Sequence, residues 1–245
     1  MKILIGIYER VGEGAGGGTE TWAETLATEY RRCGHEVRIA GQDMRGVNLC
    51  SDEYDIALVG YSPILDKLRG MACPKVSTCH GVTSAFDDQV GHPDFNAAVS
   101  EEVQRKLKMR GIESTVIRNP IDTDLFAFQE SNETPEVITF YSRYQGHTTP
   151  GVPVSQTCGT KPFTARRTVA EAFPNARIVG RTGHVSAAGV PGMLGNSDIV
   201  IGLGRSALEA MSCGCNVIVY DYAGGDGFMT PDRMVEARKN NCSGR

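Results

Sequence analysis

The sequence has no long hydrophobic stretch and no concentration of positive charge. No apolar run approaches the roughly 20 residues that a membrane-spanning helix needs. The first eight residues, MKILIGIY, are followed by Glu9 and Arg10 without a small-residue cleavage site, which argues against a signal peptide. Lysine and arginine never occur in runs longer than two, and the formal net charge is −4. We therefore expect a cytoplasmic protein that does not bind nucleic acid through its phosphates.

The eight cysteines also lack the spacing of a metal site. They contain no Cys-x-x-Cys pair and lie scattered, mostly beside apolar residues. This pattern favours free thiols in a reducing compartment over disulfides or zinc. His92, His147 and His184 show no metal-ligand spacing among themselves either. We expect no bound metal.

What the chain does have is an ordinary globular composition with an excess of glycine. Apolar residues make up 40% and charged residues 22%, which argues against disorder. Glycine accounts for 29 of the 245 residues, against a typical share of about 7%. The glycines cluster between apolar runs, which indicates tight turns where the backbone approaches a neighbour closely.

Strands and helices alternate along the chain. Apolar runs predict strands, and segments with helical spacing between them predict helices. This alternation is typical of parallel sheets covered on both faces. We expect an α/β protein of two Rossmann-like domains, residues 1–121 and 135–245, joined by a linker over residues 122–134. Two such domains would face a cleft at the carboxyl ends of their strands, where ligands of this fold class bind.

Two strand-to-helix turns are candidate anion sites. The glycines at positions 16–18 follow the first strand and precede a helix, and Gly202 and Gly204 occupy the same place in the second half. Backbone N–H groups at such turns can bind phosphate. The first cluster matches neither the dinucleotide motif nor the P-loop motif. A flexible surface loop is the alternative interpretation.

His80 and Glu209 are the candidate reactive side chains. His80 stands at the end of the strand predicted over residues 75–79, where an imidazole can orient a hydroxyl or stabilise developing charge. Glu209 lies just over one turn into a helix, where its carboxylate can accept hydrogen bonds from both ribose hydroxyls. A half-buried structural histidine and a solvated helical glutamate are the alternatives.

Together these segments resemble the retaining glycosyltransferases of family four, which have the GT-B fold. The resemblance covers almost the whole chain and rests on these matches: Gly17-Gly18-Thr19-Glu20, Gly34-His35-Glu36-Val37, His80-Gly81, Val99-Ser100-Glu101, Val116–Phe126 and Leu208-Glu209-Ala210-Met211-Ser212-Cys213-Gly214.

The resemblance implies a hexosyltransferase-type enzyme of glycan biosynthesis. Its donor would be a UDP- or GDP-linked sugar held mainly by the second domain, without metal or cofactor. Its acceptor would be a sugar, a lipid-linked molecule or another hydroxyl, and a lipid-linked acceptor would bring peripheral membrane contact. His80, Arg143 and Lys161 would be the catalytic residues. The donor-binding residues would be Gly17, Gly18, Gly202, Gly204, Arg205, Ser206 and Glu209.

Three departures leave other functions open. Thr148 stands where the family has a lysine, so Lys161 is either the displaced lysine or a surface residue. Ile201 stands where the family often has an acid, and the second domain is shorter than the family's. The alternatives are a nucleotide-sugar epimerase or hydrolase, and a module that binds nucleotide or glycan without turnover.

Overall fold

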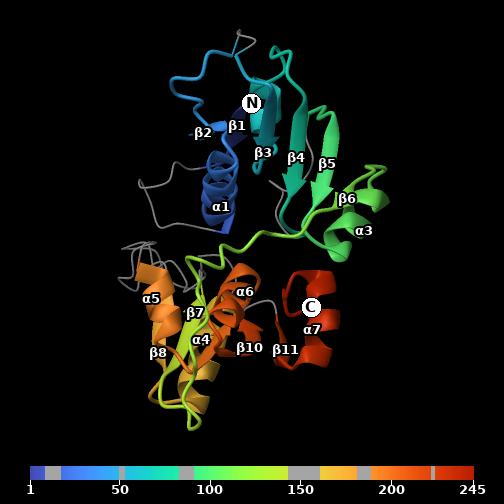
Figure 1. Cartoon of the computed structure of the whole chain (residues 1–245). Coiled ribbons are helices and arrows are strands. Elements are labelled where there is room, and N and C mark those ends of the chain that lie inside the picture. The colour runs from blue at the N-terminus through green and yellow to red at the C-terminus, as the bar shows by residue number, and fades with distance from the viewer. Residues whose placement is uncertain (9–17, 50–52, 83–90, 143–160, 181–188, 222–223) are drawn as a thin grey trace, which may run out of the picture. The chain divides into compact units, whose positions relative to one another are not determined.

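The computed structural model describes residues 1–8, 18–49, 53–82, 91–142, 161–180, 189–221 and 224–245. The chain divides into two compact units, Met1–Pro120 and Ile121–Arg245. In each unit the strands lie side by side in one sheet, and helices pack on the sheet (Figure 1).

The first unit is built on a six-stranded sheet in the order β2-β1-β3-β4-β5-β6. Every adjacent pair of strands in it is parallel. The strands are β1 (Lys2–Gly6), β2 (Glu36–Ala40), β3 (Ile56–Val59), β4 (Lys75–Cys79), β5 (Phe95–Ala98) and β6 (Thr115–Val116). The helices are α1 (Gly18–Arg32), α2 (Ile64–Lys67) and α3 (Glu101–Met109).

Alternate side chains of β1 pack against different helices on the two faces of the first sheet. Ile3 and Ile5 pack in a cluster with Trp22 of α1, whereas Leu4 packs in a cluster with Ile64 and Leu68 beside α2. Successive side chains of a strand point to opposite faces, so both faces of this sheet are buried. This accounts for the nearly continuous apolar run of β1, as expected for a parallel sheet.

The second unit has a five-stranded sheet in the order β11-β10-β9-β7-β8. Its strands are parallel except for β10 and β11, which pair antiparallel. They are β7 (Ile138–Ser142), β8 (Arg177–Gly180), β9 (Ile199–Gly202), β10 (Asn216–Asp221) and β11 (Gly224–Phe228). The helices are α4 (Lys161–Ala172), α5 (Val190–Gly195), α6 (Arg205–Ser212) and α7 (Pro231–Ala237), followed by the 3-10 turn η3 (Arg238–Asn240).

The second sheet is likewise covered on both faces. Val200 of β9 packs with Ala207 of α6 and Leu194 of α5, whereas Ile201 packs with Val169 of α4. The predicted fold class, an α/β protein with two Rossmann-like units, is confirmed by these two sheets. No described helix is long and apolar enough to cross a membrane.

Two elements of the second unit were not predicted. The short helix α5 has the sequence VPGMLG, and β11 has the sequence GGDGF. Neither segment shows a hydrophobic period, and glycine and proline disfavour both kinds of element. Their formation therefore depends on tertiary contacts, such as the pairing of β11 with β10.

The segment expected to be a linker, residues 122–134, packs within the second unit. Phe126 is only 3% exposed and belongs to the apolar cluster around α6. The Ser212 hydroxyl donates to the Phe126 carbonyl at 2.8 Å, and the Gln129 N–H donates to the Cys213 carbonyl at 2.9 Å. The segment forms no helix or strand. Its sequence therefore shows no hydrophobic period from which these contacts could be predicted.

Candidate functional site

The strand order of the second unit reverses between β7 and β9, and its candidate site lies at their carboxyl ends. Loops from two such strands leave in opposite directions, and ligands of doubly wound folds bind in the crevice between them. A Cβ atom on Gly202 would lie 2.9 Å from the Tyr141 carbonyl oxygen. Only glycine therefore lets the end of β9 lie so close to β7. Gly204 has a φ of 57°, a conformation that glycine adopts without steric cost.

A buried ion pair follows immediately in α6. Arg205 donates from Nε to Glu209 Oε1 at 3.1 Å, and its Nη2 lies 3.0 Å from the same oxygen. Arg205 is 8% exposed and Glu209 is 4% exposed. Burial raises the pKa of the Glu209 carboxyl, and the Arg205 guanidinium opposes that rise. Burial also lowers the pKa of Arg205. The sequence placed both residues in the site but did not reveal that they are paired.

Tyr141 lies beside this pair at the end of β7. Burial raises the pKa of its phenol to about 12, and the negative charge of Glu209 adds to the rise. The phenol therefore stays protonated at neutral pH and keeps the capacity to donate a hydrogen bond. Sequence reasoning did not single out Tyr141, although it is the last residue of the strand predicted over residues 137–141.

The turn before α6 differs from the expected anion site in one respect. The Gly204 N–H, which we expected to be exposed for a phosphate, donates to the Cys242 carbonyl at 2.8 Å. The Ser206 N–H lies 3.2 Å from the Leu203 carbonyl oxygen. Cys242 is fully buried and has a φ of 53°. The N–H groups of Gly204 and Ser206 are therefore already hydrogen-bonded to carbonyl groups of the chain. Side chains must supply a larger share of any phosphate binding at this turn.

In the first unit, the carboxyl end of β4 carries His80. The His80 ring packs edge-on against Trp22 of α1, with ring centroids 5.0 Å apart and an interplanar angle of 79°. Trp22 in turn lies against Gly60, where a Cβ atom would come within 2.8 Å of the indole Cζ3. His80 is half-buried. The histidine is thus placed at the predicted strand end with an aromatic ring beside it.

Lys106 of α3 is a buried residue that sequence reasoning did not assign to the site. Its side chain is directed to the turn after His80, where Nζ donates to the Gly81 carbonyl at 3.1 Å. Lys106 is only 7% exposed and shares the buried face of α3 with Val103 and Leu107. The available sequence signal was its position next to Leu107 and three residues after Val103, on the apolar face of the helix.

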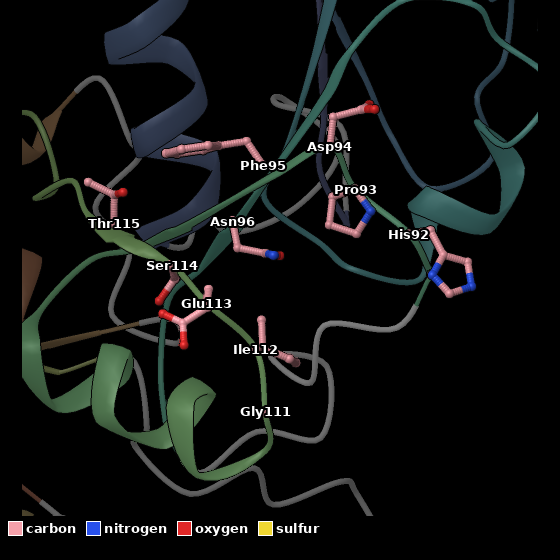
Figure 2. Close-up of a pocket in the computed structure, with 11 residues that line it drawn as sticks. His92, Pro93, Asp94, Phe95, Asn96, Gly111, Ile112, Glu113, Ser114 and Thr115 are labelled. Atoms are coloured by element: carbon pink, nitrogen blue, oxygen red, sulfur yellow. The ribbon is translucent and has the colours of Figure 1, made fainter.

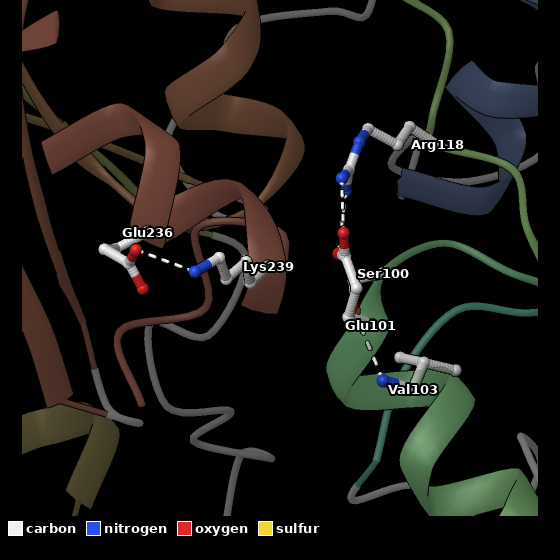
Figure 3. Close-up of polar contacts among 6 residues, drawn as sticks. All are labelled: Ser100, Glu101, Val103, Arg118, Glu236 and Lys239. Atoms are coloured by element: carbon white, nitrogen blue, oxygen red, sulfur yellow. Dashed lines mark hydrogen bonds and ion pairs between the residues drawn. The ribbon is translucent and has the colours of Figure 1, made fainter. Parts of the chain in front are cut away.

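Side-chain contacts in the first turn of α3 hold the segment that follows β6, near the end of the first unit. The Ser100 hydroxyl accepts from the Val103 N–H at 3.3 Å and so caps the helix. Arg118 forms a two-pronged ion pair with Glu101, at 2.7 and 3.1 Å (Figure 3). This pair ties the segment that leaves β6 to the first turn of α3.

The remaining predicted site residues are placed only in part. Gly18 begins α1, but Gly17 and Arg143 lie outside the described residues. Lys161 begins α4, and its side chain also lies outside the description. Among the described residues, no group of three or more histidine, cysteine, aspartate or glutamate side chains could hold a metal ion.

A hollow of about 700 Å³ lies elsewhere in the first unit, at the amino ends of β5 and β6. Asn96, Pro93 and Ile112 surround it in Figure 2. None of the predicted site residues lines it. The hollow is therefore separate from the candidate site.

No protein-family model matches the chain, and no curated protein matches it. Among solved structures, it is similar to a Listeria monocytogenes protein considered to be a UDP-N-acetylglucosamine 2-epimerase. The TM-score is 0.46 and the identity 13%, over 88% of this chain and 78% of that one.

Two sugar-binding proteins are similar to a lesser degree. A LacI-family transcriptional regulator from Arthrobacter sp. FB24, in complex with lactose, has a TM-score of 0.30 and 10% identity, over 88% of this chain and 75% of that one. The arabinose-transporter binding protein of Shewanella sp. ANA-3, bound to L-arabinofuranose, has a TM-score of 0.29 and 14% identity, over 88% and 70%. Similarity at these identities and TM-scores gives no information about function.

Proposed function

We propose that the chain is a nucleotide-sugar enzyme that transfers a sugar to a hydroxyl acceptor, with the nucleotide bound by its second unit. The buried Arg205–Glu209 pair is the observation that carries the proposal. Burying two charges costs more free energy than their attraction commonly returns, so a buried pair adds little to stability by itself. Its location beside Gly202, at the reversal of strand order, is where this fold class binds ligands.

The chemistry of the pair suits a nucleoside diphosphate. A carboxylate accepts hydrogen bonds only, so Glu209 would receive those of the two ribose hydroxyls. A guanidinium carries five N–H donors in a planar fork that matches phosphate oxygens. Arg205 would therefore bind the diphosphate while it orients Glu209. Tyr141, Ser206, Gly202 and Gly204 would line the same site.

The resemblance to family-four glycosyltransferases supports the reaction type. The bond from the sugar C1 atom to the leaving diphosphate would break, and a bond from C1 to the acceptor oxygen would form. The acceptor proton would go to the leaving diphosphate. Arg143 and Lys161 would neutralise the charge that grows on the diphosphate, which is the kind of contact that accelerates a reaction. His80 would position the sugar or the acceptor, and Gly17 and Gly18 would face the donor phosphates.

Epimerisation or hydrolysis of a nucleotide sugar is the second candidate for the same site. Ile201, at the position where the resemblance would place an acid, is 1% exposed and packs in the core with Val169. A contact to the donor sugar that a transferase of this family would make is thus replaced by core packing. The Listeria protein described above is also considered an epimerase.

One assay separates these reactions. The protein would be incubated with UDP-, GDP- and ADP-linked sugars, with and without a panel of sugar and lipid-linked acceptors, and the products analysed by mass spectrometry and NMR. Nucleoside diphosphate released only with acceptor would support transfer. Release without acceptor would indicate hydrolysis, and an isomerised nucleotide sugar would indicate epimerisation. Binding without any product would reduce the chain to a binding module, and no binding would overturn the proposal.

A further inference from the structure

The residue after His80 is held in place by two side chains of the first unit. Lys106 Nζ donates to the Gly81 carbonyl at 3.1 Å, and the Cys79 thiol lies 3.4 Å from the same oxygen. Lys106 comes from α3, whereas Cys79 is the last residue of β4. A charged donor makes the stronger hydrogen bond of the two, so Lys106 contributes most to fixing this carbonyl.

The residue before His80 is held independently by the sheet. Cys79 is paired with Ala98 of β5, and its carbonyl accepts from the Val99 N–H at 3.2 Å. The backbone on both sides of His80 is therefore fixed, by the strand ladder at Cys79 and by Lys106 at Gly81. Between these two points the imidazole has Trp22 at its side. The imidazole thus lies between two fixed backbone positions and beside an aromatic ring.

The cost of burying Lys106 indicates that the contact has a purpose beyond packing. Its carbon stem runs along the face of α3 that also buries Val103 and Leu107, a site where an apolar residue would satisfy the fold. A long side chain with apolar methylene groups can cross such a face and bring its charged end to a polar atom. Here that atom is the carbonyl next to His80.

We propose that Lys106 is a positioning residue, which sets the orientation of the His80 imidazole by holding the Gly81 carbonyl. The inference rests on the proposed function in one respect, namely that His80 meets the sugar or the acceptor. Removal of Lys106 should therefore lower turnover more than it weakens substrate binding. A misplacement of about 1 Å at a reacting group can reduce the rate by roughly 100-fold, so we expect kcat to fall by roughly 10- to 100-fold.

The test compares Lys106→Met with Lys108→Met, a change at an exposed position of the same helix. Lys106→Met keeps an unbranched apolar side chain, one heavy atom shorter than lysine, and removes the charge. Lys106→Arg keeps a cation and should restore part of the loss. The full-length protein would be labelled at its histidines for NMR, with the His80 signal assigned by its absence in His80→Gln. Thermal unfolding would confirm that each variant is folded.

In Lys106→Met we expect the His80 ring signal and its pH midpoint to move, while both stay at wild-type values in Lys108→Met. With a nucleotide sugar that the wild type turns over, kcat should fall and KM should stay within about twofold. A folded Lys106→Met protein with an unchanged His80 signal would overturn the inference, whatever its activity. A moved His80 signal with wild-type kcat would overturn the catalytic part. A wild type that turns over no nucleotide sugar would instead overturn the proposed function, while the NMR result would still decide whether Lys106 orients the ring.

Discussion

The Arg205 guanidinium faces the Glu209 carboxylate one helical turn away, and both contacts converge on a single oxygen, Oε1, at 3.0 and 3.1 Å. Both side chains are buried at the start of α6, beside the end of β9. The arrangement places one negative and one positive group near the reversal of strand order, where doubly wound folds bind ligands. It also makes the two residues interdependent.

Removing Glu209 should therefore affect both binding and folding. Glu209→Ala removes the carboxylate that faces the buried Arg205 charge, and breaking a buried ion pair typically costs about 3–5 kcal/mol of unfolding free energy. The lost hydrogen bonds to ribose should weaken nucleotide binding by roughly 1.5–3 kcal/mol. Urea unfolding and calorimetric titration measure the two effects. Stability close to that of the wild type would show that the pair is not buried as described.

Gly60→Ala should disturb the His80 region through Trp22. The new methyl group would meet the indole at 2.8 Å, and such overpacking commonly costs about 1–3 kcal/mol. Trp22 is the only tryptophan in the chain, so its fluorescence reports this site directly. Gly192→Ala is the matched control, because a Cβ atom there has no described neighbour within 4 Å. Equal emission spectra for the two variants would contradict the packing of Trp22 against Gly60.

The buried Cys242 thiol should make stability depend on alkaline pH. Burial raises its pKa from 9.0 to about 11. The folded state therefore binds more protons than the unfolded state between about pH 9 and 11, so this contribution is complete below pH 9 and is lost as pH rises to 11. A shift of two units corresponds to roughly 2–3 kcal/mol. Urea unfolding at pH 8 and pH 10.5 should show a larger loss for the wild type than for Cys242→Ala. Equal losses would place the thiol in contact with water.

Much of the fold could be predicted from hydrophobic pattern, because parallel strands buried on both faces produce short apolar runs. The sequence predicts strands over residues 36–40, 75–79, 177–180 and 199–202, and β2, β4, β8 and β9 have the same bounds. The elements α5 and β11, and the packing of Phe126, could not be predicted, because they depend on contacts distant in sequence. The hydrophobic period of a sequence segment carries no information about such contacts.

The candidate site was predictable in its residue types but not in its pairing. Strand ends and glycine turns indicated Gly202, Glu209 and His80. The spacing of four residues between Arg205 and Glu209 was visible in the sequence, yet only burial distinguishes such a pair from a solvated one. The use of the Gly204 N–H by Cys242 joins positions 38 residues apart (242 − 204), which no spacing rule foresees.

Activity should survive chelation of divalent metals. The sequence Asp122-Thr123-Asp124 has an Asp-x-Asp spacing, but the Asp122 carboxylate accepts from the N–H groups of Asp124 at 3.1 Å and Leu125 at 2.9 Å. This carboxylate thus closes a local turn. Turnover should be equal with and without EDTA, and Asp124→Asn should leave it unchanged. Loss of turnover on chelation, with recovery on addition of Mn²⁺, would make these two aspartates metal ligands.

Nucleotide titration of a variant that replaces the whole ion pair tests the proposed site most directly. The double variant Arg205→Met/Glu209→Leu substitutes apolar residues for both buried charges, a change that is often neutral or stabilising for the fold. UDP, GDP and ADP would be titrated by calorimetry into the wild type and into this variant, after thermal unfolding has shown that both are folded. We expect one of the three nucleotides to bind the wild type and to lose at least about tenfold in affinity in the double variant, which corresponds to roughly 1.4 kcal/mol. Equal affinity for the two proteins, or no binding to the wild type, would contradict a nucleotide site at Arg205 and Glu209.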